Sequence, residues 1–189
     1  FGCENVDYLD FYNFDTKQVT SFSLFLGECK SLTSIRISSK FDTSSAVEMY
    51  SMFTQCLSLT SLDLSSFKTE KVTNMNYMFN DCQSLTSLDV STFRTSNVET
   101  MSGMFQNLQL IENLDLTNFD TKNVYDMSLM FNHCPLLKKI QFSNNFITDN
   151  VRDMYKMFGS CFELESVDLS HFDTSKVTDM CYMFYDTHF

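Results

Sequence analysis

The chain has 189 residues, a formal net charge of −11 and 43% hydrophobic residues, enough apolar material to bury the core of one globular domain. The acidic balance argues against nucleic acid and anionic membranes as partners, because both select basic surfaces. No apolar run approaches the roughly 18 residues of a membrane span. The start of the chain has no signal-peptide pattern. Phe1 stands where an initiator methionine would be, so we expect a processed chain or a fragment.

The sequence repeats itself every 26 or 27 residues. One phenylalanine per repeat marks the register: Phe14, Phe41, Phe67, Phe93, Phe119, Phe146 and Phe172. A threonine stands two residues after each of them, and an apolar residue, mostly valine, stands five residues after. All twelve methionines fall into two columns three residues apart, which hold Phe22 and Phe25 in the first repeat. The residue after the second column is Phe, or Leu26 in the first repeat. A fixed period of this kind is typical of a solenoid.

Each repeat predicts a strand, a tight turn and a helical turn in that order. Residues 88–91 alternate between apolar and polar, which predicts a short strand. The apolar residues from Val72 to Cys82 follow the spacing of one helix face. Thr69 stands where a hydroxyl could cap such a helix. We therefore expect stacked turns in which both methionine columns face a shared core.

The repeat "CxSLTSLDLSSFxTxxVTxMxxMF" resembles the BspA-like class of leucine-rich repeats, over essentially the whole chain. Departures such as Ala46 and Leu108 are apolar exchanges. The resemblance implies an α/β leucine-rich-repeat solenoid of about seven turns, with a parallel sheet on its concave side and short helical turns on its convex side. It also implies a location at the cell surface or outside the cell, and adhesion or ligand binding rather than catalysis.

Six cysteines share one column: Cys3, Cys29, Cys56, Cys82, Cys134 and Cys161. Their spacing fits no zinc motif. Equivalent side chains of stacked turns point in parallel, so we expect buried free thiols, with disulfides between neighbouring turns as the alternative. Cys181 falls in the column of Asn76, Ser102 and Ser128, which we expect to face solvent. It is a candidate intermolecular contact together with Phe184.

An aspartate stands in the strand of each repeat that has a short turn: Asp10, Asp63, Asp89, Asp115 and Asp168. Arg36 and Gln141 replace it in the two repeats that have a longer turn. Stacked carboxylates could bind Ca²⁺. The association with short turns instead favours aspartates that accept hydrogen bonds from backbone N–H groups just ahead of them.

The outward strand positions form the expected binding face. Its candidate residues are Tyr8, Arg36, Asp63, Asp89, Glu112, Asp115, Lys138, Lys139 and Glu165. We find no catalytic, cofactor or metal constellation, and we expect a protein or a glycan on another cell or matrix as the partner.

Residues 1–189 read as a single domain, expected to belong to a longer repeat array because neither end carries a polar cap. The alternative function is a structural subunit that stacks head to tail into a fibre.

Overall fold

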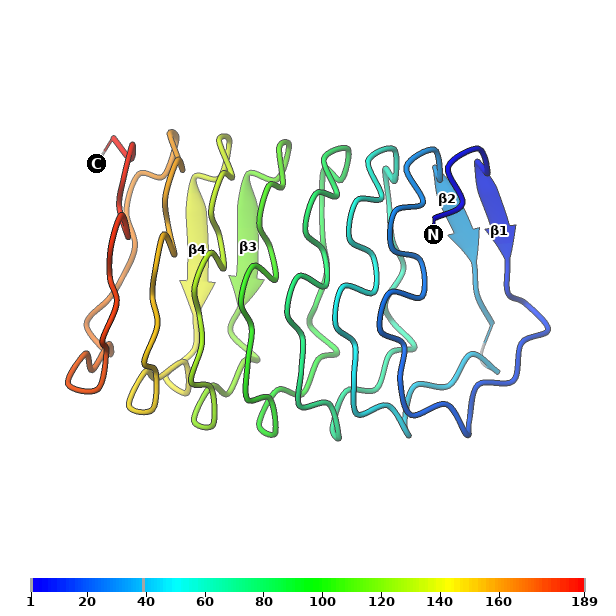
Figure 1. Cartoon of the computed structure of the whole chain (residues 1–189), viewed down its shortest axis with the longest axis horizontal. Coiled ribbons are helices and arrows are strands. Elements are labelled where there is room, and N and C mark those ends of the chain that lie inside the picture. Colours follow the sequence, from blue (N-terminus) through cyan, green and yellow to red (C-terminus); the bar gives the residue numbers. More distant parts are fainter. Residues whose placement is uncertain (1, 39, 189) are drawn as a thin grey trace.

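The computed structural model describes residues 2–38 and 40–188, which form a row of stacked turns from one terminus to the other (Figure 1). On one side, here called the strand face, β1 (Tyr8–Asp10) pairs in parallel with β2 (Ser34–Arg36). Further along the row, β3 (Asn113–Leu116) pairs in parallel with β4 (Lys139–Phe142). Between the two pairs, residues 60–64 and 86–90 run in the same row without strand pairing. The expected single sheet is therefore divided.

The unbroken backbone ladder lies on the opposite side, beside the methionines. Parallel bridges link one residue of each turn to the next, in the order Ser21, Glu48, Asn74, Thr100, Asp126, Asp153 and Asp179. The described residues contain no helix, so the prediction of helical turns, and with it the α/β class, is wrong. The described chain is a solenoid whose regular structure consists of β-strands, bridges and turns.

Consecutive β-turns explain the helix-like spacing of the methionine columns. In residues 75–82, the N–H groups of Met78, Asn80 and Cys82 donate to carbonyls three residues earlier. The N–H groups of the alternate residues donate to the next turn; that of Phe79, for example, lies 3.0 Å from the Met104 oxygen. Tyr77 and Asp81 have φ of 55° and 59°, as the third residue of a type II turn requires. Side chains at i, i+3, i+4 and i+7 thus face inward, as on a helix.

The core contains nearly all of the methionines and a column of stacked phenylalanines. Neighbouring rings from Phe53 to Phe184 lie 5.5–6.0 Å apart and within 10° of parallel: Phe53, Phe79, Phe105, Phe131, Phe158 and Phe184. Offset stacking at such distances is favourable. Both methionine columns are buried except for Met180, which is 48% exposed. The prediction of a methionine core is confirmed.

The threonine column joins successive turns rather than capping helices. The Thr95 hydroxyl donates to the carbonyl oxygen of Asp120 at 3.0 Å and accepts from the N–H of the same residue at 2.9 Å. Thr69 makes the same two bonds with Arg94. These hydroxyls are buried, so each satisfies two backbone groups that the turn would otherwise bury unpaired.

Among the described residues all seven cysteines are free. Cys29, Cys56, Cys82, Cys134 and Cys161 are buried, as predicted, but Cys3 is exposed. Cys3 lies in the first turn, where no earlier turn among the described residues covers it. Cys181 is exposed as predicted. The other residues of its column, Asn76, Ser102 and Ser128, were also expected to face solvent but are not exposed. Ser102 and Ser128 are buried and share a hydrogen bond of 2.8 Å.

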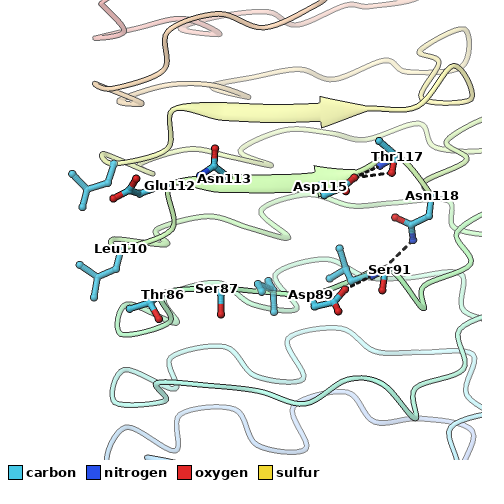
Figure 2. Close-up of a pocket in the computed structure, with 13 residues that line it drawn as sticks. Thr86, Ser87, Asp89, Ser91, Leu110, Glu112, Asn113, Asp115, Thr117 and Asn118 are labelled. Carbon is cyan, nitrogen blue, oxygen red and sulfur yellow. Dashed lines mark hydrogen bonds between the residues drawn. The ribbon is translucent and has the colours of Figure 1, made fainter.

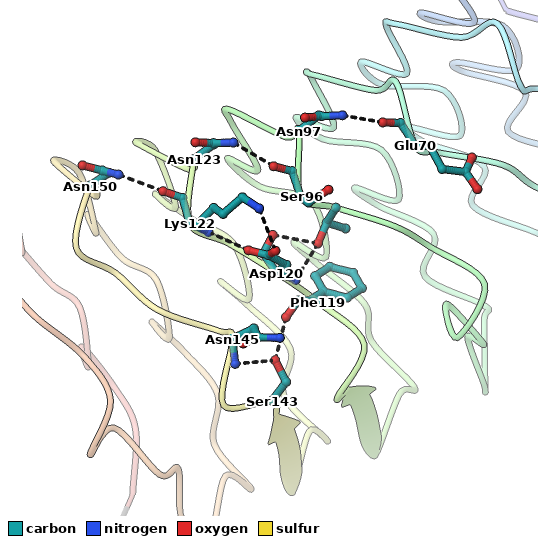
Figure 3. A network of polar contacts seen from close by, with 11 residues as sticks. Glu70, Ser96, Asn97, Phe119, Asp120, Lys122, Asn123, Ser143, Asn145 and Asn150 are labelled. Atoms are coloured by element: carbon teal, nitrogen blue, oxygen red, sulfur yellow. Dashed lines mark hydrogen bonds and ion pairs between the residues drawn. The ribbon is translucent and has the colours of Figure 1, made fainter.

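A second ladder of side chains runs along one edge of the solenoid (Figure 3). The amide nitrogens of Asn97, Asn123 and Asn150 donate to the carbonyl oxygens of Glu70, Ser96 and Lys122 at 2.6, 2.7 and 2.8 Å. Each bond crosses from one turn to the previous one. Turn-to-turn hydrogen bonds from Asn, Thr and Ser explain how the chain turns so often with only four glycines and one proline.

Candidate functional site

Each of the two strand pairs on the strand face joins an aspartate to a different residue type. Asp10 lies opposite Arg36 in β1–β2, and Asp115 lies opposite Gln141 in β3–β4. On its other side Asp115 faces Asp89, and Asp89 faces Asp63; neither of these neighbouring segments is paired. Like charges directly opposite one another disfavour strand pairing. Repulsion thus disfavours pairing at these two steps. It does not explain why residues 60–64 stay unpaired with β2, where Arg36 stands next to Asp63 in the column.

A groove with a volume of about 780 Å³ lies between residues 86–91 and β3. Its lining combines hydroxyls, amides, carboxylates and a few aliphatic side chains: Thr86, Ser87, Leu88, Asp89, Val90, Ser91, Leu110, Glu112, Asn113, Asp115, Thr117, Asn118 and Leu136. Leu110 lies at one end, and Thr117 and Asn118 lie at the other (Figure 2). A smaller cleft of about 140 Å³ separates residues 62–65 from 89–92.

The apolar end of the groove exists because a serine column is broken there. In earlier turns Ser31, Ser58 and Ser84 each donate to a carbonyl oxygen of the preceding turn. Leu110 and Leu136 occupy this column in the next two turns and have no hydroxyl to donate. They are 43% and 39% exposed. Replacing serine by leucine removes the hydrogen bond between turns and places Leu110 and Leu136 at one end of the groove.

The polar end of the groove is held by side chains. The Asn118 amide nitrogen reaches back 2.9 Å to the carbonyl oxygens of Val90 and Phe93. On the other wall, Asp115 accepts hydrogen bonds from the Thr117 hydroxyl at 2.7 Å and the Thr117 N–H at 3.0 Å. These bonds lower the pKa of Asp115, and the negative charge of Asp89 works against that lowering.

The same cap recurs along the aspartate column. Asp10, Asp63, Asp89 and Asp168 each accept a backbone N–H from two residues ahead, at 2.8 to 2.9 Å. In the longer turns the hydroxyl oxygens of Ser38 and Ser143 accept instead. The prediction that these aspartates cap short turns is confirmed.

The other predicted site residues are spread over the strand face. Arg36 approaches Asp10 at 3.3 Å and lies 4.2 Å from the ring centre of Tyr12. Tyr8 is exposed in β1, far along the row from the groove. Lys138 pairs with Glu112 at 2.9 Å, which raises the pKa of Lys138 through that hydrogen bond.

Only three of the predicted residues come together at the groove, namely Asp89, Glu112 and Asp115. Lys139 and Glu165 are exposed beyond it, and Asp63 lines the smaller cleft. Cys181 and Phe184 lie in the last turn, where Phe184 stacks on Phe158. Sequence reasoning missed Leu110, Leu136 and Asn118. The loss of serine from its column at Leu110 was the signal that could have located the groove.

Two further observations concern only the described residues. They hold no group of three or more His, Cys, Asp and Glu side chains placed to bind a metal ion. They also hold no helix with the length and apolar character of a membrane span.

The fold and the groove define a repeat solenoid with a divided strand face. The chain belongs to the family described as "Mycoplasma protein of unknown function, DUF285", whose profile matches residues 1–114 and 109–189. Comparison with curated proteins finds no match.

Solved structures that resemble the chain include two bacterial proteins. A leucine-rich repeat protein of T. pallidum has 15% identity and a TM-score of 0.49, with 77% of this chain and 61% of that one covered. A leucine rich cell surface protein of Faecalibacterium prausnitzii A2-165 has 16% identity and a TM-score of 0.45, with 88% and 48% covered. The chain thus spans about half to three fifths of the length of these proteins.

Proposed function

We propose that this chain is a non-enzymatic binding module of a cell-surface or secreted adhesin, which recognises a protein or a glycan through its strand face. The observation that carries the proposal is the groove beside β3, which is open, mixed in polarity and lined by residues of neighbouring turns. Such concave sites with few convergent polar groups are typical of ligand binding. The resemblance of the repeat to BspA-like surface proteins supports the location.

The test applies the biotinylated chain to arrays of extracellular-matrix proteins and of glycans. We expect saturable binding to members of one array, reduced by the double variant Asp89→Asn/Asp115→Asn, which keeps the turn acceptors but removes two charges. The variant Asp168→Asn, on the same column but outside the groove, serves as the matched control. A chain that binds neither array, although folded by circular dichroism, would contradict the proposal.

A second candidate, head-to-tail stacking into a fibre, is favoured by one observation. Met180 is 48% exposed in the last turn, whereas its equivalent Met154 is buried beneath the turn that follows it. A first turn from another copy could cover Met180 in the same way, and contacts that do not close by rotation would give filaments. Sedimentation velocity over a concentration series tests this, with Met180→Asp expected to abolish association. A chain that remains monomeric at high concentration would rule the candidate out.

A further inference from the structure

The first turn of the solenoid approaches the second very closely at Gly2. This residue has φ of 67°, and a Cβ atom added to it would lie 2.5 Å from the carbonyl oxygen of Glu28. A side chain cannot come so near a backbone atom, so only glycine permits the contact. The backbone on one side of Cys3 therefore packs directly against the second turn.

The other side of Cys3 is held in the same register. The carboxylate of Glu4 pairs with the Lys30 ammonium group at 3.4 Å. This ion pair joins residues that are 26 positions apart, as does the contact at Gly2. Cys3 and Cys29 have the same separation and stand between these two contacts. The two cysteines thus lie opposite one another on adjacent turns.

The side chains of Cys3 and Cys29 also interact. Burial raises the pKa of Cys29; the backbone of Cys3 lowers it, whereas the charge of Cys3 and a hydrogen bond between the two side chains raise it. The Cys56 thiol instead donates to the carbonyl oxygen of Leu26 at 3.2 Å. Cys3 is exposed, whereas Cys29 and Cys56 are buried. One accessible thiol therefore lies beside a protected one.

We propose that Cys3 and Cys29 form a redox-active pair, which a low-molecular-weight disulfide oxidises to a disulfide bond between the first and second turns. Paired parallel strands of adjacent turns lie about 4.8 Å apart. Disulfides join residues whose Cα atoms are about 4.4–6.8 Å apart, so the spacing of the stack suits the bond. This inference does not depend on the proposed binding function.

The reaction is a thiol–disulfide exchange in two steps. The Cys3 thiolate attacks one sulfur of the oxidant, here glutathione disulfide, forms a mixed disulfide and releases one glutathione. The Cys29 thiolate then attacks the Cys3 sulfur and releases the second glutathione. Two protein thiols give up two electrons and two protons, and these convert one glutathione disulfide into two thiols. Because burial raises the pKa of Cys29, the second step should accelerate as the pH rises.

Closing the bond requires a small movement of the first turn. Cβ atoms joined by a disulfide are about 3.5–4.5 Å apart, whereas parallel side chains of stacked turns keep the larger spacing of their backbones. Cys3 precedes β1, in a segment without strand or bridge pairing, at one end of the row of turns (Figure 1). This segment can approach Cys29 while β1 stays paired with β2. The bond would fasten a turn that has one neighbour among the described residues.

The test equilibrates the reduced whole chain with mixtures of reduced and oxidised glutathione. After an acid quench and alkylation in urea, trypsin cleaves after Lys17 and Lys30, which places the two cysteines on separate peptides, 1–17 and 18–30. Mass spectrometry without reduction then measures how much of the two peptides is linked. We expect the linked fraction to rise with the share of oxidised glutathione and to exceed one half in the most oxidising mixture.

Two variants examine the geometry of the pair. Gly2→Val adds a side chain where none fits, so it should push the first turn away from the second and lower the linked fraction at least tenfold in a mixture that half-oxidises the unaltered chain. Cys181→Ser removes the other exposed thiol and serves as the matched control, with no change expected. Equal linkage in Gly2→Val and the unaltered chain would show that the close approach does not position the thiols.

Stability provides an independent readout. The oxidised chain should unfold at a higher urea concentration than the reduced chain, because the bond restricts the unfolded chain. Cys3→Ser, at an exposed position, should fold but lose this difference. Peptide 1–17 found only with glutathione attached, or joined to Cys181 of another copy, would overturn the proposal. Peptide 18–30 linked to the peptide of Cys56 as often as to 1–17 would overturn it too.

Discussion

The thiol of Cys82 lies 3.2 Å from the carbonyl oxygen of Phe53, one turn earlier in the solenoid. Cys56, Cys134 and Cys161 make the same contact with the preceding turn at 3.1 to 3.2 Å. A buried cysteine behaves as a small apolar residue with a weak donor. The column therefore packs the corner of each turn and also satisfies a buried carbonyl.

Thiol reactivity should follow position in the stack. Burial raises the pKa of Cys56 to about 12 and that of Cys161 to about 11, so thiolate is scarce there at neutral pH. We expect Cys3 and Cys181 to react with iodoacetamide in the native protein and the buried thiols to react only after unfolding. Peptide mass mapping measures this, and native labelling of Cys82 at the rate of Cys181 would contradict it.

The reactivity of the Cys181 thiol should also depend on the neighbouring carboxylate of Asp179. A hydrogen bond and the charge of Asp179 raise the pKa of the Cys181 thiol. The variant Asp179→Asn keeps the acceptor for the Cys181 N–H, which lies 2.8 Å away, but removes the charge. The pKa should fall, so labelling of Cys181 at pH 8 should accelerate while that of Cys3 stays unchanged. An unchanged rate for Cys181 would remove Asp179 as the cause.

Truncating side chains on the methionine side of the solenoid should lower the free energy of unfolding, both at the buried Met78 and at the partly buried Asn76. Met78→Ala should lower the free energy of unfolding by about 2–5 kcal/mol, because it empties a packed site. Asn76, expected from sequence to face solvent, accepts from the Thr100 hydroxyl at 2.6 Å and the Ser102 N–H at 2.7 Å. We now expect Asn76→Ala to cost about 1–3 kcal/mol. Urea titration measures both, with exposed Glu99→Ala as the near-neutral control.

The threonine ladder can be tested with an isosteric pair. Thr95→Val keeps the shape of the side chain but leaves two buried backbone groups of Asp120 without their partner. We expect a loss of about 1–3 kcal/mol. Thr95→Ser keeps the hydroxyl and should lose clearly less. If the two variants were equally stable to urea, the hydroxyl would not contribute.

Residues with positive φ should tolerate replacement by glycine without loss of stability. His133 is exposed and has φ of 61°, where a side chain costs about 1–2 kcal/mol. His133→Gly should therefore raise thermal stability slightly, by up to about 1 kcal/mol after the entropy cost of glycine. His133→Val should lower it. Glu163→Gly, exposed and without positive φ, should be destabilising; a gain there as large as at His133 would refute the explanation.

Acid should weaken the turns that aspartates cap. Hydrogen bonds from Thr117 lower the pKa of Asp115 in the folded chain. A depressed folded pKa contributes stability that is present above the unfolded value, about 3.9, and is lost as pH falls through the folded value. The free energy of unfolding should thus decline below about pH 4. Asp115→Asn keeps the acceptor and should show a shallower decline in urea titrations at pH 2–5, whereas an identical slope would exclude Asp115 as a contributor.

The repeat columns identified three residues of the groove, Asp89, Glu112 and Asp115, but not how the groove forms. The sequence identified Asp89 and Asp115 as outward strand residues and associated them with short turns, because turn length and residue type covary. It did not show that the segments that carry them stay unpaired, since neither residue alone reveals which neighbours pair. It also did not single out Leu110, which replaces the serine of its column.

The sequence by itself determined the repeat, its register and the inward columns, because stacked copies of one unit must bury the same positions in every turn. Only the tertiary structure decided that β-turns, rather than helices, carry the methionines. Both conformations bury residues at i, i+3, i+4 and i+7, so the spacing cannot separate them. The difference lies in the hydrogen bonds: the N–H of Phe79 donates to Met104 in the next turn, a partner that exists only once the turns have stacked.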